Sequence, residues 1–183
     1  MGRRETGKQA ELRVRDKLEL LRLVVEKPEG DRGIRLETHA PGNRSRHALI
    51  QVKGRNPEKD PNLRWFQIRV SGKELKRAKE QGWPPDQTWK DKVQEVDFFV
   101  LVALRVDEIW VLTRPRVHEL IRLNEFRYGS RPDNDFAYET PQKYRQKEMN
   151  LDIEVNREVL TSRFQDCKDN FDPILAYLGV SSS

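Results

Sequence analysis

The apolar run over residues 96–104 constrains the fold of this chain more than any other segment. Within it, residues 98–104 form seven consecutive apolar positions. A strand of this composition is buried on both faces, so the sheet that contains it needs a layer of structure on each side. After a turn at Asp107, the alternation over residues 109–113 predicts a second strand beside the first.

Helical and strand patterns surround these two strands. Thr6 and Gln9 form a capping box, and the apolar residues that follow it recur at three- to four-residue steps, as on one face of a helix. Other segments alternate with period 2 between turn residues, which is typical of a hairpin or meander. In chain order, the patterns predict a helix over residues 6–23, strands over 34–38, 48–53 and 65–70, a helix over 71–81, a helix from near Pro115, and two helical pieces over 156–178 that break near Pro173.

This order of elements favours an α/β fold, in which helices flank a mixed central sheet on both faces. We expect residues 1–123 to form the α/β core. Residues 124–150 are polar throughout and rich in turn-forming residues, so we expect a long loop there. Together with the helical segment that follows, they make residues 124–183 an extension of the same domain.

Composition excludes several classes of protein. The longest apolar run is far shorter than the about 20 residues that a membrane-spanning helix needs. The N-terminus leads into charged residues rather than an apolar signal core, and Cys167 is the single cysteine, so neither an internal disulfide nor a zinc cluster can form. We therefore expect a soluble, cytoplasmic protein with no membrane partner.

The charge of the chain is distributed unevenly. Residues 1–82 carry 21 Lys and Arg against 12 Asp and Glu, and residues 83–183 carry 14 against 18. The N-terminal part thus has a net charge of +9 and the remainder −4, which together give the +5 of the whole chain. A basic half favours a polyanionic partner, with nucleic acid as the first expectation; a solvated, charge-rich surface is the alternative.

Four polar residues converge if the predicted strands over 34–38 and 48–53 pair. Gln51 and Lys53 are two residues apart on one strand, so their side chains leave the same face. Glu37 lies on the other strand, and Asp31 lies at its entrance. Carboxylate and amide oxygens can hold Mg²⁺ or Mn²⁺, which activates water, and a neighbouring lysine can offset the charge that develops on a phosphate. The pattern therefore predicts a site for phosphodiester hydrolysis, although a solvated strand surface could show the same residues.

Three arginines flank this cluster in the sequence. Arg44, Arg46 and Arg55 could contact the phosphates of a nucleic acid, and a basic turn is the competing interpretation. His39 and the other two histidines show no spacing typical of metal ligands.

The segments Gly33-Ile34-Arg35-Leu36 and Gln51-Val52-Lys53 resemble the motif of the PD-(D/E)xK nuclease superfamily, which includes restriction enzymes and Holliday-junction resolvases. The resemblance extends over about residues 6–113 and implies a mixed sheet with flanking helices. It also implies roles for individual residues: Asp31 or Glu37 as the first metal-binding acid, Gln51 as the second ligand, Lys53 as the catalytic lysine, and Glu11 as the acid that some members add from the first helix.

The chain departs from the superfamily motif at two positions. Arg35 occupies the place of the expected acid, and Gln51 occupies the place of Glu or Asp, which makes this a QxK variant. An amide oxygen can still coordinate a metal ion, but each change removes negative charge. Glu37 lies one pleat repeat beyond Arg35 on the same face and could replace the missing acid.

Three functions are compatible with these observations. The favoured one is a metal-dependent endonuclease that hydrolyses phosphodiester bonds in double-stranded DNA, acting as a homodimer because cutting both strands often uses two copies of one site. The second is a catalytically inert nuclease fold that serves as a DNA-binding or assembly subunit. The third is a basic RNA-binding domain without a metal site.

Overall fold

The computed structural model covers residues 1–183 and describes residues 3–28, 36–55, 66–70, 96–120, 151–155 and 157–181. Its elements are α1 (Arg3–Leu20), β1 (Val24–Glu26), β2 (Leu36–Ala40), β3 (Asn43–Arg55), β4 (Phe66–Val70), β5 (Phe98–Ala103), β6 (Glu108–Thr113), β7 (Leu151–Val155), α6 (Arg157–Arg163), the 3₁₀ turn η1 (Gln165–Cys167) and α7 (Asp172–Leu178). Residues 114–120 are also helical.

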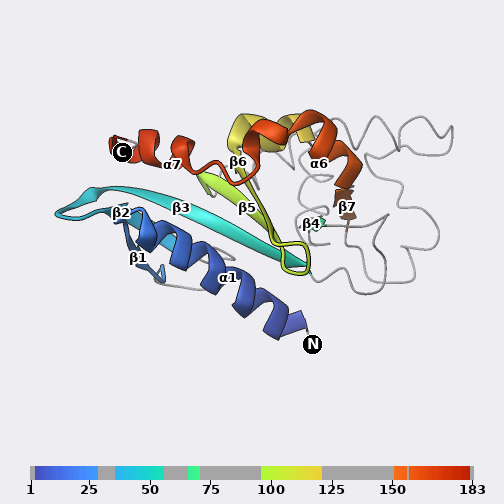
Figure 1. The fold of residues 1–183 in the computed structure, drawn as a ribbon, viewed down its shortest axis with the longest axis horizontal. Coiled ribbons are helices and arrows are strands. Elements are labelled where there is room, and N and C mark those ends of the chain that lie inside the picture. Colours follow the sequence, from blue (N-terminus) through green and yellow to red (C-terminus); the bar gives the residue numbers. More distant parts are fainter. Residues whose placement is uncertain are drawn as a thin grey trace, which may run out of the picture.

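A five-stranded mixed sheet forms the centre of the fold, in the order β1-β2-β3-β5-β6 (Figure 1). β3 and β5 run parallel, whereas the other neighbouring strands of this sheet are antiparallel. Helices flank the sheet, so the predicted α/β class is confirmed. β4 and β7 pair with each other in a separate two-stranded sheet.

One face of the sheet packs against α1 and α7. Ala10, Val14 and Leu18 recur along α1 at four-residue steps and are fully buried. They join the inward-facing residues of the strands and three residues of α7 in one hydrophobic cluster. Although residues 157–181 come late in the sequence, α7 therefore supplies part of this core. Among the described helices, none is long and apolar enough to cross a membrane.

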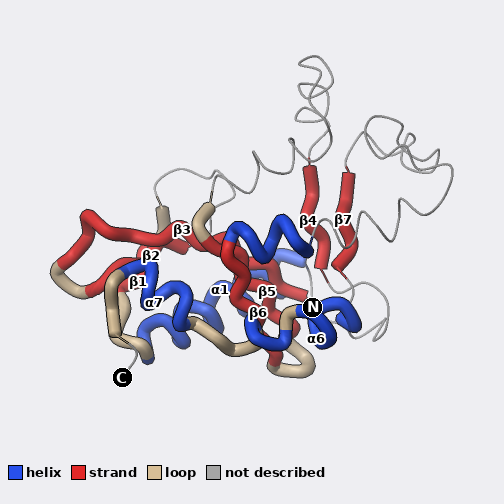
Figure 2. Tube along the Cα trace, turned by 90° about the horizontal axis from the view of Figure 1, so that it is seen from above, coloured by secondary structure: helices blue, strands red, loops and turns tan. Residues whose placement is uncertain are grey.

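The opposite face of β5 and β6 is also apolar. Phe99, Trp110 and Leu112 are fully buried there, and Val117 and Leu120 of the helix over 114–120 are buried as well. Figure 2 shows this helix on the other side of the sheet from α1 and α7. The prediction that β5 is buried on both faces is thus confirmed, since each of its residues is buried.

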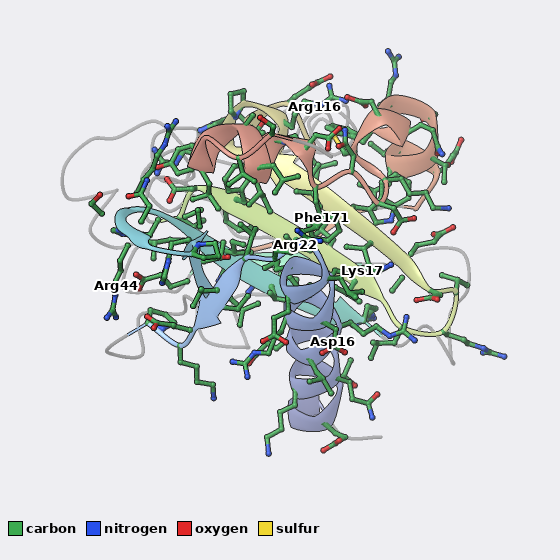
Figure 3. All side chains as sticks on the ribbon, turned by 60° about the vertical axis from the view of Figure 1, so that its left-hand side comes forward. Asp16, Lys17, Arg22, Arg44, Arg116 and Phe171 are labelled. Atoms are coloured by element: carbon green, nitrogen blue, oxygen red, sulfur yellow. The ribbon has the colours of Figure 1, made fainter. Side chains whose placement is uncertain are left out.

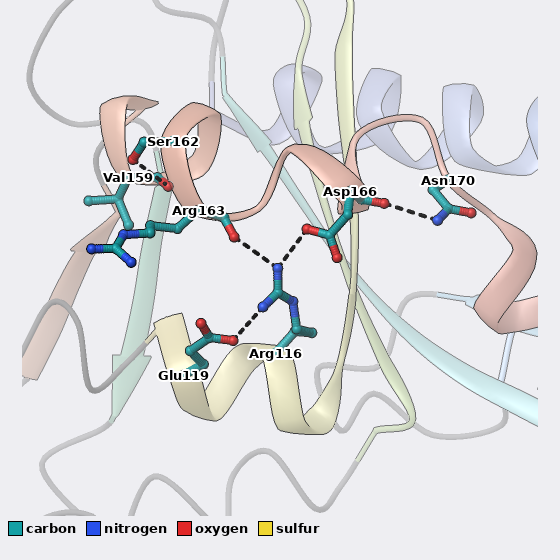
Figure 4. A network of polar contacts seen from close by, with 7 residues as sticks. All are labelled: Arg116, Glu119, Val159, Ser162, Arg163, Asp166 and Asn170. Carbon is teal, nitrogen blue, oxygen red and sulfur yellow. Dashed lines mark hydrogen bonds and ion pairs between the residues drawn. The ribbon is translucent and has the colours of Figure 1, made fainter.

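Arg116 fastens the helix over 114–120 to α6 and η1 (Figure 4). Its guanidinium donates to Glu119 at 2.5 Å, to the Arg163 carbonyl oxygen at 2.9 Å and to Asp166 at 2.6 Å. It also lies over the Phe164 ring, 4.4 Å from the centroid. These contacts hold the C-terminal segment against the sheet edge formed by β6.

Several sequence predictions differ from the structure. The strand predicted over 65–70 does not extend the meander, because β4 pairs with β7 instead. β1 and β7 lie in segments for which we predicted no strand. The C-terminal segment forms two helices, as predicted, but the break between them lies before Pro173 rather than at it; this proline lies in the first turn of α7, where its missing N–H costs nothing. The helix predicted over 71–81 falls outside the described residues.

The close contact between α1 and β3 leads to a stability prediction. A Cβ atom at Gly54 would lie 2.6 Å from Ala10 Cβ and 2.8 Å from the Thr6 carbonyl oxygen. We expect Gly54→Ala to lower the free energy of unfolding by about 1–3 kcal/mol, because α1 must shift to admit the methyl group. Urea unfolding followed by circular dichroism measures the change.

Gly7→Ala provides the control. A Cβ at Gly7 meets no atom within 4 Å, and alanine favours a helix. We therefore expect this variant to be as stable as the wild type or up to about 1 kcal/mol more stable. Equal stabilities of the Gly54 and Gly7 variants would contradict the close packing of α1 on β3.

Candidate functional site

The alternation of β3 separates its core-facing side chains from its polar ones. Ala48, Ile50 and Val52 are buried in the cluster with α1 and α7. Gly54 faces the same way, because a Cβ built on it points at Ala10. The side chains at positions 49, 51, 53 and 55 therefore lie on the opposite face, where they are half-buried.

The neighbouring strands complete the surroundings of Gln51 and Lys53. Glu37 of β2 pairs with Leu49, so its side chain lies on the same face as those of Gln51 and Lys53. Glu37 is the diagonal neighbour of Gln51, at a backbone separation of about 7–8 Å. On the other side, Gln51 pairs with Phe99 of β5 and Lys53 with Leu101 of the same strand. Phe99 and Leu101 are fully buried. The polar side chains thus lie beside buried apolar side chains, where electrostatic interactions are stronger than in bulk water.

α1 lies on the other side of β3 from Gln51 and Lys53. Because Thr6 and Ala10 press against Gly54, Glu11 of α1 lies near the strand end that carries Lys53. Asp31 and Arg35, the other two positions in the sequence prediction, lie outside the described residues.

Among the described residues of β2 and β3, this face offers one carboxylate, from Glu37, and one amide oxygen, from Gln51, while Glu26 of β1 pairs with Glu37 and is bound by Arg44. Within the described ranges, no group of three or more His, Cys, Asp or Glu side chains could hold a metal ion. The two available donors are hard oxygens, and Mg²⁺ typically takes only one or two protein carboxylates besides water and substrate oxygens. The chemistry of these two donors fits Mg²⁺ or Mn²⁺.

The three predicted phosphate-binding arginines separate along β3. Arg55 follows Lys53 by two residues and shares its face. Arg44 and Arg46 lie in the hairpin at the other end of the strand, where Arg44 donates to Glu26 of β1 at 2.8 Å. Figure 3 shows Arg44 at the edge of the molecule. The hairpin arginines therefore do not flank Gln51 and Lys53 in space, although they do in the sequence.

Sequence analysis missed Asp97, which anchors β3 beside β5. Its carboxylate accepts from the Leu49 backbone N–H at 2.9 Å and from Arg114 at 2.6 Å, and its own N–H donates to the Leu49 carbonyl oxygen at 2.8 Å. Arg114 also donates to the Val96 carbonyl oxygen at 2.6 Å. An acidic residue at the boundary of an apolar run was the available signal. These bonds fix the register of β3, and with it the positions of Gln51 and Lys53.

No protein-family model and no curated protein sequence matches the chain. Among solved structures, it is similar to a bacterial homing endonuclease, I-Ssp6803I, with 13% sequence identity and a TM-score of 0.45. The similarity covers 96% of this chain and 93% of that one. Values this low do not establish a shared family.

Removal of the Asp97 carboxylate tests its anchoring role. Asp97→Ala leaves Arg114 and the Leu49 N–H without this acceptor, so we expect the free energy of unfolding to fall by about 1–3 kcal/mol. Glu19→Ala, which removes an exposed acid from α1, should change it by less than about 0.5 kcal/mol. Urea unfolding compares the two variants, and similar small effects would show that Asp97 does not anchor β3.

Proposed function

We propose that this protein is a metal-dependent endonuclease that hydrolyses phosphodiester bonds in DNA. The observation that carries the proposal is the joint placement of Glu37, Gln51 and Lys53 on one face of β2 and β3, beside the apolar side chains of Phe99 and Leu101. The mixed sheet with flanking helices agrees with the resemblance of the sequence to the PD-(D/E)xK superfamily. Asp31 is the further acid that we propose for the same site.

Each residue has a distinct task in the proposed reaction. The Glu37 carboxylate and the Gln51 amide oxygen would hold Mg²⁺ or Mn²⁺, which when bound polarises the phosphate and lowers the pKa of water. Lys53 lies about 7 Å along β3 from Gln51 and is cationic at neutral pH. Its ammonium group would orient the attacking water or stabilise the negative charge that develops on the phosphate.

The neighbouring structure favours this use of Lys53. Leu101 pairs with Lys53 and is fully buried, so the strand beside Lys53 presents an apolar side chain on this face. Arg55, two residues further on the same face, would bind a phosphate next to the reacting one. The pairing of two copies to cut both strands of a duplex belongs to the same proposal.

One observation favours a second function. Glu37 is the single carboxylate that the described residues of β2 and β3 place on this face, because position 51 is a glutamine. A site with too little negative charge would not hold a divalent cation. The chain would then be an inert nuclease fold that binds DNA or assembles with other proteins.

Plasmid cleavage tests the proposed activity. We expect the wild-type protein to nick supercoiled plasmid with Mg²⁺ or Mn²⁺ and to be inactive in EDTA. Lys53→Ala should lower the rate by at least about 100-fold, because it removes a preorganised charge at the reacting phosphate.

Lys17→Ala is the matched control for this assay. Lys17 is exposed on α1, on the other side of β3 from the proposed site, so its loss should leave the rate within about twofold of the wild type. Metal-dependent nicking that survives Lys53→Ala would remove Lys53 from the mechanism. A wild type that binds DNA but never cuts it would favour the inert fold.

A negative charge introduced at position 51 tests metal binding separately from cleavage. Gln51→Glu adds a second carboxylate, so we expect Mn²⁺ to bind at least about tenfold more tightly, as measured by isothermal titration calorimetry. Gln165→Glu adds the same charge in η1 and should leave the affinity unchanged. Equal Mn²⁺ affinities of wild type and Gln51→Glu would show that Gln51 is not a ligand.

A further inference from the structure

Residues 41–47 form a projecting arm at the end of β2 and β3 (Figure 1). Every residue of this arm is exposed. Its sequence, Pro-Gly-Asn-Arg-Ser-Arg-His, contains neither an acidic nor a large apolar side chain. An arm of this composition adds nothing to a hydrophobic core, yet it lengthens β3 well beyond the part that is buried.

The arm departs from the regular ladder between β2 and β3. Ala40 pairs with Asn43, but His39 pairs with His47, so Arg44, Ser45 and Arg46 bulge out of the ladder. Bulges of this kind re-aim side chains and increase local twist. They tend to occur beside functional sites.

The two arginines of the arm reach different sides of the sheet. Arg44 donates to Glu26 of β1, and Glu26 pairs with Glu37, which lies on the face of the candidate site. Arg46 lies against the end of α7, on the core-facing side, because a Cβ at Gly179 would be 2.8 Å from its Nη1 atom. The arm thus presents one cation toward each side.

The base of the arm is firmly held. Asp97 binds both Leu49 and Arg114 beside it, as described above. Tyr177 of α7 packs edge-on against Phe98, with ring centroids 5.6 Å apart. Partial burial and the Asp97 carboxylate raise the pKa of Tyr177, so its phenol stays protonated. By contrast, Arg44 can exchange Glu26 for another anion at little cost. Its side chain is 73% exposed, and its ion pair with Glu26 contributes little stability.

The length of β3 sets the distance between the arm and the candidate site. At about 3.3 Å per residue, Arg46 lies up to about 23 Å from Lys53 and Arg44 up to about 30 Å. Duplex DNA rises about 3.4 Å per base pair, so these spans correspond to about 7–9 base pairs. A two-stranded ribbon fits the major groove, which is about 12 Å wide.

We propose that the arm enters a groove of duplex DNA up to about 7–9 base pairs from the phosphate at the candidate site, where Arg44 and Arg46 contact the phosphates of the two groove walls. This inference rests on the proposed function, from which it takes DNA as the substrate and Lys53 as the reacting end. It adds that the substrate is an extended duplex that the chain holds at two places.

DNA binding in EDTA tests the arm without any cleavage. Fluorescence anisotropy with a labelled 20-base-pair duplex gives the slope of log Kd against log salt concentration. Each lost phosphate contact lowers the steepness of this slope by about 0.9, so we expect a decrease of about 1.8 for the double variant Arg44→Ala/Arg46→Ala. The double variant Arg44→Lys/Arg46→Lys keeps both charges and should retain the wild-type slope.

Lys17→Ala/Arg163→Ala is the matched control, since it removes two exposed cations outside the arm and should alter the slope by less than about 0.5. An unchanged slope in the arm variant overturns the inference, even when the wild type cuts DNA. A reduced slope supports it, even when the wild type never cuts, in which case the proposed nuclease activity alone fails. A wild type that does not bind DNA overturns both.

A second copy of the chain is the competing partner for the arm, and light scattering distinguishes the two. A change in molecular mass of the Arg44→Ala/Arg46→Ala variant, together with a wild-type salt slope, would assign the arm to self-association and overturn DNA binding by it.

Discussion

The packing of β3 against α1 is the constraint on which the rest of the structure depends. Ile50 and Val52 must face α1 and α7 to remain in the core, so the strand sends Gln51 and Lys53 to the opposite face. A slip of one residue would exchange the two sets and bury a lysine among apolar side chains. The close approach at Gly54 and the hydrogen bonds of Asp97 both oppose such a slip. The same interactions that stabilise the fold therefore position the candidate site.

The elements with strong periodicity could be predicted from the sequence, whereas those that depend on distant partners could not. The continuous apolar run of β5 and the stripe of α1 are local signals that the core requires, and both predicted elements are present. β1 was missed because Val24 and Val25 continue the apolar stripe of α1. The prediction for β4 gave the wrong sheet. Its partner β7 lies far along the chain, so the residues near Phe66 carry no local signal of this pairing.

The same distinction applies to the candidate site. Period-2 alternation sufficed to place Gln51 and Lys53 on one face. The turn alone would pair Glu37 with Arg46, and the bulge over residues 44–46, which the sequence did not reveal, pairs it with Leu49 instead. The sequence could not show that α1 covers the other face of β3, with Thr6 and Ala10 against Gly54. Nor could it show that β3 begins at Asn43, so that Arg44 and Arg46 lie far from Lys53.

The charges of the proposed site also bear on the order in which its ligands bind. The formal charges of Glu37 and Lys53 cancel, and Gln51 adds none. A divalent cation therefore finds little net attraction from these three residues alone, whereas a bound phosphodiester brings both negative charge and oxygen ligands. In the proposed site, metal and DNA should each strengthen the binding of the other, because such coupling is reciprocal. Contacts to phosphates remote from the metal then also raise the metal occupancy of the proposed site, because they hold the reacting phosphate near Lys53.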